Sequence, residues 1–522
     1  MRRLLLLPAL WCACAQPAPE PPPVDAASYP VIEDPALAQL RWVLELANRP
    51  LDDFTDLEAA NQRDLTAYRY AIAFTGYAMA AVQYHLWPAW AEVLQPAMNR
   101  LIEKLLRRPV WEYWAEVSRG VPTLEPALDR PYPEAHDPVG DKNVMYSGHL
   151  AHLSALYAML YRDFRWDQPG SMTFEWSPDE IYRYDAGSLT EVLHRQMAQN
   201  REPGICCEPN AVFPECNQHP ILAFRLRDAT HRTSFFSISE RFFDFFVRKG
   251  LTDPETGETA MLYLMKQDST LSQSNPKYHN ANDPLIAQLI EEGIITLESA
   301  TANGWTGTFM HAWKPEFVEA LYPVWKARHY TPTDDGAATL KDETWEPRVR
   351  YGFFAMLAAE MGDRDARDRL LAHADRHFPI LRGDGTLHYH CPPVSTSPCT
   401  NLTDRLLLFA RVLPRHGWLA IHEHPFGDDH FRSPRWSGID WPRVLVRRAI
   451  WDPTREALVA SFRPADPVPG AVTTVRAEGL DPRRSWRVLR DGAEILRAGR
   501  VDSLELEVPL DADHDVVVQA LP

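Results

Sequence analysis

The stretch VMYSGHLAHLSALYAMLYRDF, residues Val144–Phe164, predicts a helix that is buried on every side. Its apolar residues recur at helical spacing, its small residues let another helix approach closely, and a third line carries Met145, His149 and His152. A helix without a charged face belongs in the interior of a protein. The two histidines therefore need polar partners, and we interpret His152 as a core histidine with satisfied hydrogen bonds.

Helical periodicity continues on both sides of this stretch, from Pro35 to about His416. We see no strand-like alternation and no strict repeat motif in this region. Paired helices at irregular spacing favour an α/α barrel, or toroid, over a solenoid. The expected helices are Leu37–Asn48, Arg63–Leu86, Ala89–Leu106, Val144–Phe164, Leu189–Asn200, His219–Gly250, Pro284–Gly293, Pro315–Arg328, Val349–Met361, Arg364–His377 and Leu402–Leu413.

The chain changes character after Gly417. Residues 417–438 are rich in Pro, Gly, His and Trp and are expected to form a linker. Short β-rich runs separated by turn signals then predict a small antiparallel, sandwich-like β domain over residues 439–522. We find no catalytic cluster there and expect a role in packing or stability. The runs are Val444–Trp451, Ala457–Phe462, Val472–Ala477, Trp486–Leu489, Glu494–Leu496 and Leu504–Val508.

The first residues have the features of an export signal. Residues 1–15 carry two arginines, a short apolar run and an Ala-Cys-Ala end, which predicts a periplasmic or secreted protein. Lipidation at Cys12 or Cys14 is an alternative. Residues 16–34 begin with a Pro-rich segment that is expected to act as a stiff tether without packing partners. The helical domain would then span residues 35–416, and no later stretch is apolar enough to cross a membrane.

Composition excludes some partners. The net charge is −17 over 522 residues, which argues against nucleic acid. The 17 Trp, 18 Tyr and 21 Phe residues are typical of helical barrels with apolar or sugar-binding cavities. No GxGxxG or P-loop pattern occurs in a suitable context, so we expect no nucleotide cofactor.

The segment GICCEPNAVFPECN, Gly204–Asn217, places two thiols on a bent segment between helices. Cys207 and Cys216 are nine residues apart, and the prolines between them prevent a continuous helix. The two thiols could form a disulfide, bind zinc, or be inert buried residues. The segment lacks the Cys-x2-Cys pairing that is usual for zinc sites, and we expect no metal there. A catalytic acid/base pair is the remaining alternative.

Four sequence blocks carry a family resemblance. They are Tyr70–Phe74 (YAIAF), Asp137–Leu150 (DPVGDKNVMYSGHL), Leu189–Asn217, and a set with Ser299-Ala300, Trp305, His311 and Ala358–Asp363 (AAEMGD). The Met-Tyr-x-Gly-His block together with the Cys-Glu-Pro and Glu-Cys-Asn block is specific. Through these blocks the chain resembles the linalool dehydratase/isomerase family from about Ala38 to Gly417.

The resemblance implies an (α/α)6 barrel, an exported ring-shaped homo-oligomer, and cofactor-free dehydration, hydration or isomerisation of monoterpene alcohols. The catalytic positions that it implies are His149, Cys207 and Cys216. The substrate would be contacted by Met145, Phe213, Trp305 and Thr301. Glu208 and Asn217 would contact the catalytic groups rather than the substrate. These residue types suit the reaction, because loss of water from a tertiary allylic alcohol needs a proton donor and a base in an apolar pocket.

The chain also departs from the family pattern. The segment Trp42–Phe54 lacks the family's Asp-Tyr pair, and Asp52 and Asp53 are its nearest carboxylates. A family tyrosine is Thr301 here, and the paired N-terminal cysteines are absent. Cys391 and Cys399 flank a Pro/Ser-rich loop and are the better candidates for a structural disulfide.

Three functions remain in competition. The first is a lyase/isomerase that acts on a small apolar alkenol such as linalool. The second is an exported carbohydrate-active hydrolase or lyase on an (α/α)6 barrel, which needs a pair of carboxylates across a cleft. Glu208 and Glu215 are its candidates. The third is a non-catalytic binding protein on the same scaffold.

Overall fold

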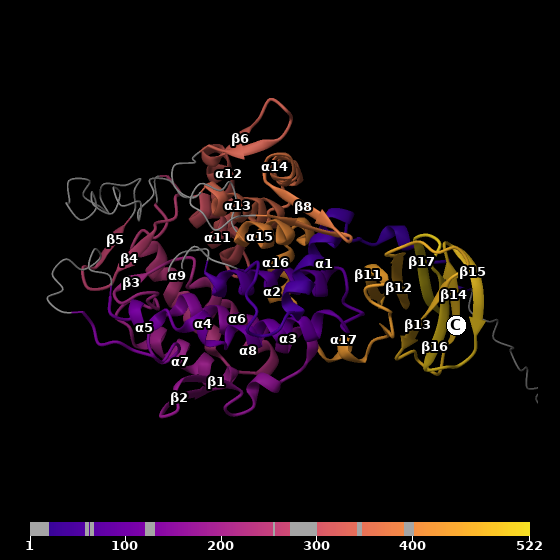
Figure 1. The fold of residues 1–522 in the computed structure, drawn as a ribbon, viewed down its shortest axis with the longest axis horizontal. Helices are drawn as coiled ribbons and strands as arrows, with labels where there is room; N and C mark the ends of the chain where they lie inside the picture. Colours follow the sequence, from indigo (N-terminus) through magenta and orange to yellow (C-terminus); the bar gives the residue numbers. More distant parts are fainter. Residues whose placement is uncertain are drawn as a thin grey trace, which may run out of the picture. The chain divides into compact units, whose positions relative to one another are not determined.

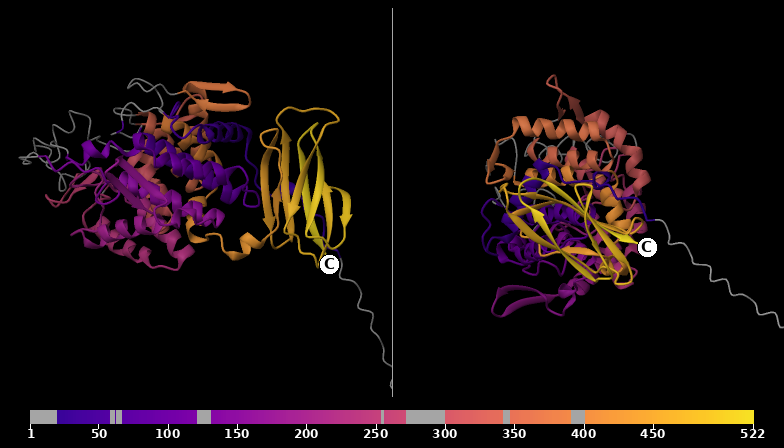
Figure 2. Two further views of the ribbon diagram at one scale, coloured as in Figure 1. Left: turned by 60° about the horizontal axis from the view of Figure 1, so that its bottom comes forward. Right: turned by 90° about the vertical axis from the view of Figure 1, so that its right-hand side faces the viewer.

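Helices dominate the chain up to Arg432 in the computed structural model (Figure 1). The structure describes residues 20–57, 62, 67–120, 131–253, 256–271, 300–341, 347–390 and 401–522. These residues divide into two units, Ile32–Arg432 and the described residues up to Val31 together with Ser433–Pro522. Figure 2 shows the helices of the first unit and, in yellow, the strands of the second. The division at Ser433 falls inside the stretch 417–438 that was expected to be a linker.

The helices are η1 Ala26–Ser28, α1 Asp34–Asn48, α2 Tyr68–His85, α3 Leu94–Leu105, α4 Arg108–Trp111, α5 Trp114–Val117, α6 Val144–Tyr161, η3 Arg165–Asp167, α7 Ala186–Gln199, α8 Gln218–His231, η4 Phe235–Ser237, α9 Ile238–Arg248, α11 Ala300–His311, α12 Pro315–His329, α13 Pro347–Glu360, α14 Arg364–His377, α15 Asn401–Val412, α16 Gly417–Glu423 and α17 Asp428–Arg432. None of the described helices combines the length and the apolar composition that crossing a bilayer requires.

Six of these helices contact one another in a cyclic order. Helix α2 contacts α6, which contacts α8, and α11, α13 and α15 continue the series until α15 returns to α2. Nearly every described side chain of α2, α6 and α11 is buried. Helices α3, α7, α12 and α14 each contact members of this ring, and α9 contacts α7. The prediction of a buried inner helix is confirmed for Val144–Tyr161, but the helix ends three residues earlier than expected, because Arg162 has a left-handed backbone.

Small residues allow two close approaches in the ring. A Cβ at Gly304 of α11 would lie 2.6 Å from the backbone carbon of Phe353 on α13, so only glycine fits. A Cβ at Gly148 of α6 would lie 3.0 Å from the Cδ of Pro220 and 3.6 Å from the backbone oxygen of Cys216. The missing side chain at Gly148 thus lets Pro220 of α8 approach α6 closely, whereas the Cys216 oxygen is at an ordinary van der Waals distance.

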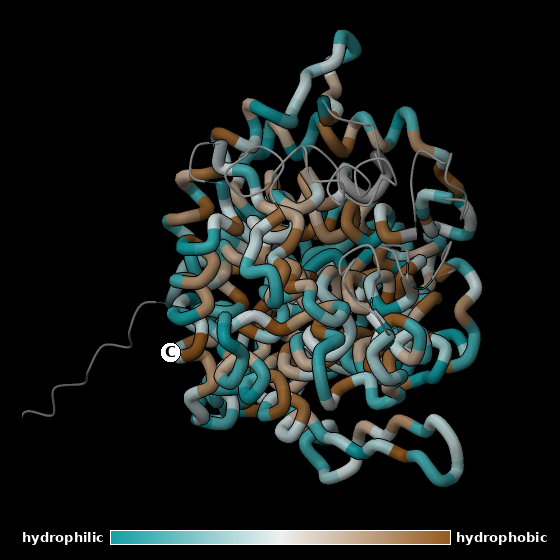
Figure 3. The backbone as a smooth tube through the Cα atoms, turned by 90° about the vertical axis from the view of Figure 1, so that its left-hand side faces the viewer, coloured by the Kyte–Doolittle hydropathy of each residue, from teal (hydrophilic) through white to brown (hydrophobic). Residues whose placement is uncertain are grey.

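Two expectations for the helical region are wrong. Short antiparallel strands interrupt it, where sequence analysis saw none. They are β1 Met172–Ser177 with β2 Glu180–Tyr184, β3 Ala211–Val212 with β4 Leu262–Leu264 and β5 Ser269–Leu271, β6 Tyr330–Pro332 with β7 Ala338–Leu340, and β8 Ile380–Gly383 with β9 Thr386–Tyr389. Two of these hairpins, β1–β2 and β6–β7, project from the helical unit and carry hydrophilic stretches in Figure 3. Most of these strands pair only with the next strand along the chain, whereas β3 pairs with β4 beyond α8 and α9. All of them are short.

The second error concerns the long helix expected over His219–Gly250. It is broken into α8, η4 and α9. Arg232 has a left-handed backbone that ends α8, and the Asp228 carboxylate accepts the backbone N–H groups of Phe235 and Phe236. A side chain that captures backbone donors in this way competes with helix continuation. The expected helix Pro284–Gly293 and the cysteines Cys391 and Cys399 lie outside the described residues.

The C-terminal unit consists of two antiparallel sheets. One sheet has the order β11-β12-β17-β14-β15 and the other β10-β13-β16. Trp436 of β10 contacts the ring of Phe462 on β12 and donates to the backbone oxygen of Val459. The strands are β10 Arg435–Ser437, β11 Val444–Asp452, β12 Ala457–Pro464, β13 Val472–Glu478, β14 Ser485–Arg490, β15 Ala493–Ala498, β16 Ser503–Pro509 and β17 His514–Leu521. Strands β10 and β17 were not predicted.

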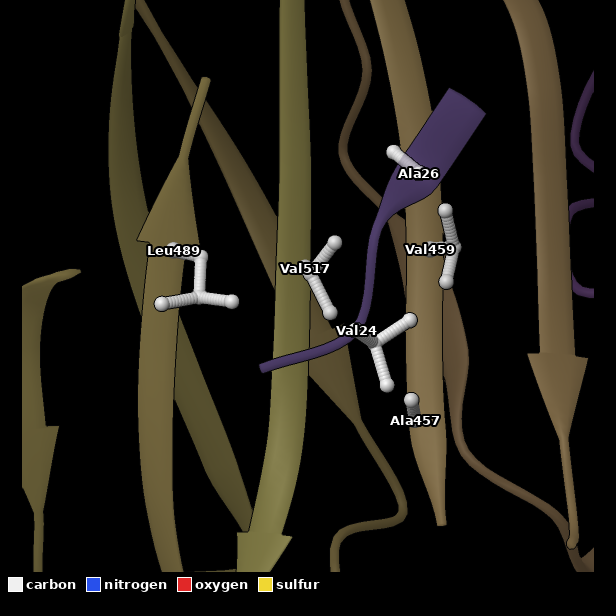
Figure 4. Close-up of a cluster of buried hydrophobic side chains, with 6 residues drawn as sticks. All are labelled: Val24, Ala26, Ala457, Val459, Leu489 and Val517. Atoms are coloured by element: carbon white, nitrogen blue, oxygen red, sulfur yellow. The ribbon is translucent and has the colours of Figure 1, made fainter. Parts of the chain in front are cut away.

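The segment that was expected to be a free tether packs onto this unit where it is described. Val24 and Ala26 are buried against Ala457, Val459 and Val517 (Figure 4). Polar contacts hold the chain just before them, since the side chains of Arg487 and Gln519 donate to the backbone oxygens of Pro21 and Pro22. Proline carbonyls remain good acceptors although the ring removes the N–H donor, and this is the contact that the sequence argument overlooked.

Candidate active site

The segment around the two cysteines is held rigid by Asn217. Its side-chain oxygen accepts the backbone N–H of Ile205 at 2.8 Å, and its side-chain nitrogen donates to the backbone oxygens of Ile205 and Phe213 at 3.0 and 2.9 Å. One amide therefore joins both ends of the segment. The middle closes as a tight turn, because Cys207 N donates to Ala211 O at 2.8 Å. A hydrogen bond from Val144 N to Cys206 O ties the turn to the start of α6.

Cys207 and Cys216 are both free, buried thiols, and their side chains are hydrogen-bonded to each other. Burial raises the pKa of both thiols. The mutual hydrogen bond raises the pKa of Cys207 further but lowers that of Cys216, and the charge of Arg69 also lowers that of Cys216. The Cys207 S–H is therefore the donor within the pair, and Cys216 is the sulfur that more readily becomes a thiolate.

Three buried histidines form a chain whose two ends fix its direction. His422 Nδ1 lies 2.8 Å from the backbone oxygen of Trp418, which can only accept, so His422 Nε2 is an acceptor. His152 Nε2 donates to it at 2.9 Å, and His152 Nδ1 accepts from His219 Nδ1 at 3.2 Å. At the other end Trp305 donates to His219 Nε2 at 2.9 Å, which requires the same tautomer. Burial lowers the pKa of all three rings and keeps them neutral.

The hydrogen-bonded chain of histidines determines which nitrogen of His149 carries a proton. The Tyr77 hydroxyl oxygen lies 2.8 Å from His149 Nδ1 and 3.2 Å from His219 Nδ1. Because His219 Nδ1 is already protonated, Tyr77 donates to His149 Nδ1. Burial and the charge of Arg69 lower the pKa of His149, so the neutral ring carries its proton on Nε2. That N–H has no hydrogen-bond partner among the described residues, although the ring is fully buried, and it can bind a substrate oxygen.

Replacing Tyr77 by phenylalanine should lower the free energy of unfolding by about 1–3 kcal/mol, because His149 Nδ1 becomes a buried acceptor without a donor. Denaturant titration of the full chain measures this change. The matched control is Tyr161→Phe, since the hydroxyl of this partly exposed tyrosine contacts the weakly accepting sulfur of Met98 at 3.2 Å. Equal losses in both variants would show that the Tyr77 hydroxyl does not hold His149.

Tyr70 contacts the His149 ring and lies within electrostatic range of both thiols. Its ring lies edge-on to His149, with centroids 5.5 Å apart, and to Trp305, with centroids 5.6 Å apart. The charges of both cysteines would raise the pKa of Tyr70, which is already raised by burial, so the hydroxyl stays protonated. Tyr70 was part of a matched sequence block but was not singled out as a site residue, and its position about two helical turns before Tyr77 gave no separate signal.

Arg69 places a fixed positive charge beside these groups. Its guanidinium carbon lies 4.6 Å from the ring centroid of Tyr70 and 4.0 Å from that of Tyr113, and Nη2 lies 3.5 Å from the sulfur of Met145. The side chain is fully buried. A cation held between aromatic faces is partly compensated by their negative quadrupoles. It stabilises an anion nearby and opposes the formation of a second cation.

Two carboxyl groups flank the thiols. Glu208 and Glu215 are partly exposed, but the Oε2 atom of each is buried and has no hydrogen-bond partner among the described residues. Burial raises the pKa of Glu215 to about 8. It raises that of Glu208 only to about 7, because the charge of Arg69 acts against the effect of burial.

The raised pKa of Glu215 makes stability depend on pH. An unfolded glutamate ionises near 4.5, whereas folded Glu215 keeps its proton up to about 8. The folded state therefore binds more protons between these values, and its stability falls as pH rises through this window. Glu215→Gln should be more stable than the parent by on the order of 2 kcal/mol at pH 8 and by little at pH 4.5, after a discount for partial exposure.

Unfolding titrations of parent and Glu215→Gln protein at several pH values test this expectation. The exposed Glu191 on α7 provides the control, because Glu191→Gln changes a carboxyl group that is already in water. An advantage of Glu215→Gln that does not change between pH 4.5 and pH 8 would contradict burial of the Glu215 carboxyl.

The other sequence candidates lie in three places. Thr301 is partly exposed on α11, one turn before Trp305. Phe213 is partly exposed and follows β3. Asp52 is exposed and forms a bidentate ion pair with Arg107, so within one chain it is engaged elsewhere. His152 has both ring nitrogens hydrogen-bonded, which confirms its interpretation as a satisfied core histidine.

The fold and these buried groups define a mostly helical protein with a pair of buried thiols and a set of buried histidines on or next to a cyclic series of helices. The chain belongs to the linalool dehydratase/isomerase family, whose model matches residues 69–290 and 284–393. The resemblance proposed from the sequence blocks is thus confirmed.

Solved structures are similar only remotely. Dfg5 from Chaetomium thermophilum in complex with glucosamine is 12% identical with a TM-score of 0.37, covering 69% of this chain and 81% of that one. A GH76 α-mannanase from Bacteroides thetaiotaomicron is 12% identical with a TM-score of 0.36, covering 68% and 87%. A GH127 β-arabinofuranosidase is 8% identical with a TM-score of 0.27, covering 96% and 81%. The scores are low, and neither fold nor function is inferred from them.

Proposed function

We propose that the cyclic series of six helices is the inner layer of an (α/α)6 barrel and that the chain is a lyase/isomerase. Its substrate would be a small, mostly apolar tertiary allylic alcohol such as linalool. The observation that carries this proposal is the pair of hydrogen-bonded free thiols, Cys207 and Cys216, whose charges act on Tyr70. The Tyr70 ring in turn contacts His149, whose Nε2–H has no hydrogen-bond partner among the described residues. Membership in the linalool dehydratase/isomerase family supports the reaction class.

In the proposed reaction His149 Nε2–H binds the substrate oxygen and orients the alcohol. One thiol protonates this oxygen as the C–O bond breaks, and water leaves. The thiolate of the pair takes a proton from the adjacent carbon as the C=C bond forms. The S–H···S hydrogen bond lets the proton pass between Cys207 and Cys216, so both end as neutral thiols and the products are one alkene and one water.

Arg69 bears on the timing of these steps. Its buried charge opposes a free allylic cation, since two like charges repel strongly in a medium of low dielectric constant. The same charge favours a thiolate at Cys216. We therefore expect proton transfer from carbon and to oxygen to be concerted rather than to pass through a long-lived carbocation.

The two carboxyl groups do not favour a glycosidase. Such an enzyme needs one carboxylic acid and one carboxylate, with pKa values pushed apart by their surroundings. Here burial raises the pKa of Glu208 and of Glu215 in the same direction.

Export to the periplasm, a ring-shaped homo-oligomer and a sandwich arrangement of the C-terminal sheets belong to the proposal as well.

The test is a panel of tertiary allylic alcohols incubated with the purified chain, with products identified by gas chromatography. We expect an alkene or a rearranged alcohol from at least one small apolar member, and none from the Cys216→Ala variant. No product from the panel, with release of sugar from an oligosaccharide panel run in parallel, would replace this proposal by a carbohydrate-active one.

A further inference from the structure

A second cluster of ionisable side chains lies further along α11. His311 ends this helix six residues after Trp305, about 9 Å along the helix axis. Glu319 projects from α12, and His416 lies just before α16. One ligand atom from each of His311, Glu319 and His416 lies within 4.8 Å of the other two. The thiol mechanism uses none of these three residues.

The buried carboxylate of Glu360 fixes the tautomer of His311. Its Oε1 lies 2.7 Å from His311 Nδ1, and its two oxygens also accept the backbone N–H groups of Trp418 and Leu419 at 2.8 and 3.1 Å. An oxygen that accepts from Nδ1 leaves the lone pair of a neutral imidazole on Nε2. A carboxylate behind a histidine in this way is the usual support of a metal-binding histidine.

His311 Nε2 points toward the other two side chains without a hydrogen bond. The His311 side chain is fully buried, and Nε2 has no hydrogen-bond partner among the described residues. Glu319 Oε1 lies 3.6 Å from it and 3.4 Å from His416 Nε2. A buried acceptor without a donor is rare in proteins, so this nitrogen calls for a ligand.

The spacing of the three atoms fits a tetrahedral ion. Zinc binds nitrogen and oxygen at about 2.0–2.2 Å, which separates neighbouring ligands of a tetrahedron by roughly 3.3–3.6 Å. The separations of Glu319 Oε1 from His311 Nε2 and from His416 Nε2, 3.6 and 3.4 Å, lie in this range, and all three ligand atoms lie within 4.8 Å of one another. We propose that His311, Glu319 and His416 bind a divalent transition-metal ion, with Zn²⁺ as the best fit. Glu319 and His416 are partly open to solvent, so water can supply the fourth ligand.

The Arg415 side chain would compete with the metal ion for His416 Nε2. Its Nε lies 3.2 Å from His416 Nε2, and a guanidinium cannot lose its proton to make room for a cation. Arg415 is exposed, so its side chain can swing away when the ion binds. Without an ion, the alternative is a protonated His311 that forms ion pairs with Glu360 and Glu319.

An ion at this place would anchor the turn that leads into α16. Glu360 accepts the backbone N–H of Trp418, and the backbone oxygen of Trp418 sets the tautomer of His422. The metal site would therefore stabilise one end of the histidine chain without touching the thiols. Its role is structural, and the proposal stands independently of the reaction catalysed.

The experiment is a titration of the untagged, reduced full chain with Co²⁺ followed by displacement with Zn²⁺. We expect one ion per chain with the visible absorption of four-coordinate cobalt and without the near-ultraviolet charge-transfer band that thiolate ligands give. Glu319→Gln and His416→Ala should each weaken binding by more than about 10-fold, because loss of an outer-shell partner alone has an effect of 10–100-fold. Zn²⁺ should raise the thermal unfolding temperature of the parent, and it should not raise that of these two variants.

The matched control is Glu316→Gln, one turn earlier on α12 and equally exposed, which should bind cobalt like the parent. Both test positions reach solvent, and circular dichroism checks that the variants are folded. No bound ion, binding that survives Glu319→Gln and His416→Ala, or a thiolate charge-transfer band would each overturn the proposal. The first of these outcomes would leave the ion-paired His311 as the explanation of the cluster.

Discussion

Alanine at Cys207 or at Cys216 should lower turnover by about 10²–10⁴-fold while the chain stays folded, the usual effect of removing an acid/base group. The physical reason is that each sulfur loses its partner in the S–H···S bond, so no group remains to return the proton. Initial rates on the best alcohol of the panel measure the change. His149→Ala should lower turnover by less, because His149 Nε2–H orients the oxygen without transferring a proton.

Cys206 provides the matched control. It directly precedes Cys207 in the chain, it is buried, and burial raises its pKa to about 12. Cys206→Ala therefore removes a thiol from the same turn and leaves the hydrogen-bonded pair intact. We expect parental turnover from this variant. A loss as large as that of Cys216→Ala would mean that the turn is merely fragile and that the thiol pair has no special role.

The inner helices were predictable because their sequences lack a polar face. Helix α6 follows from this pattern alone, and its small residues correctly announce close helix contacts. The hairpins were not predictable, because strands of two to six residues between helices are too short to show alternation. The break after α8 depends on one aspartate, Asp228, which captures backbone donors, and its spacing resembles many ordinary helical positions.

The cysteine turn and His149 could be proposed from sequence, since a thiol pair bent by prolines and a histidine on a buried helix are local features. The groups that determine the state of His149 could not. Tyr77, His219 and His422 come from three helices far apart in the sequence, and only the ring brings them together. Arg69 could not be predicted for another reason: a lone arginine in the first turn of a helix is usually exposed, whereas here two tyrosine faces compensate its charge.

Oxidation that joins Cys207 to Cys216 should abolish turnover, and a thiol reductant should restore it. The two sulfurs are already hydrogen-bonded and belong to a turn that Asn217 holds together, so they meet without unfolding. A disulfide has no proton to donate and no thiolate to accept one. The measurement is turnover against the fraction of protein in which peptide mapping finds this bond, after equilibration with mixtures of reduced and oxidised glutathione.

Variants separate this bond from oxidation elsewhere in the chain. Cys206→Ala should lose activity on oxidation as the parent does, because the pair remains. Reductant should not rescue Cys216→Ala, since its loss is chemical rather than reversible. Turnover should fall in proportion to the cross-linked fraction, because each cross-linked molecule is inactive. Protein that is fully cross-linked between Cys207 and Cys216 and still turns over its substrate would exclude both sulfurs from the proton transfers. His149 and Tyr70 would then be the groups to test as acid and base.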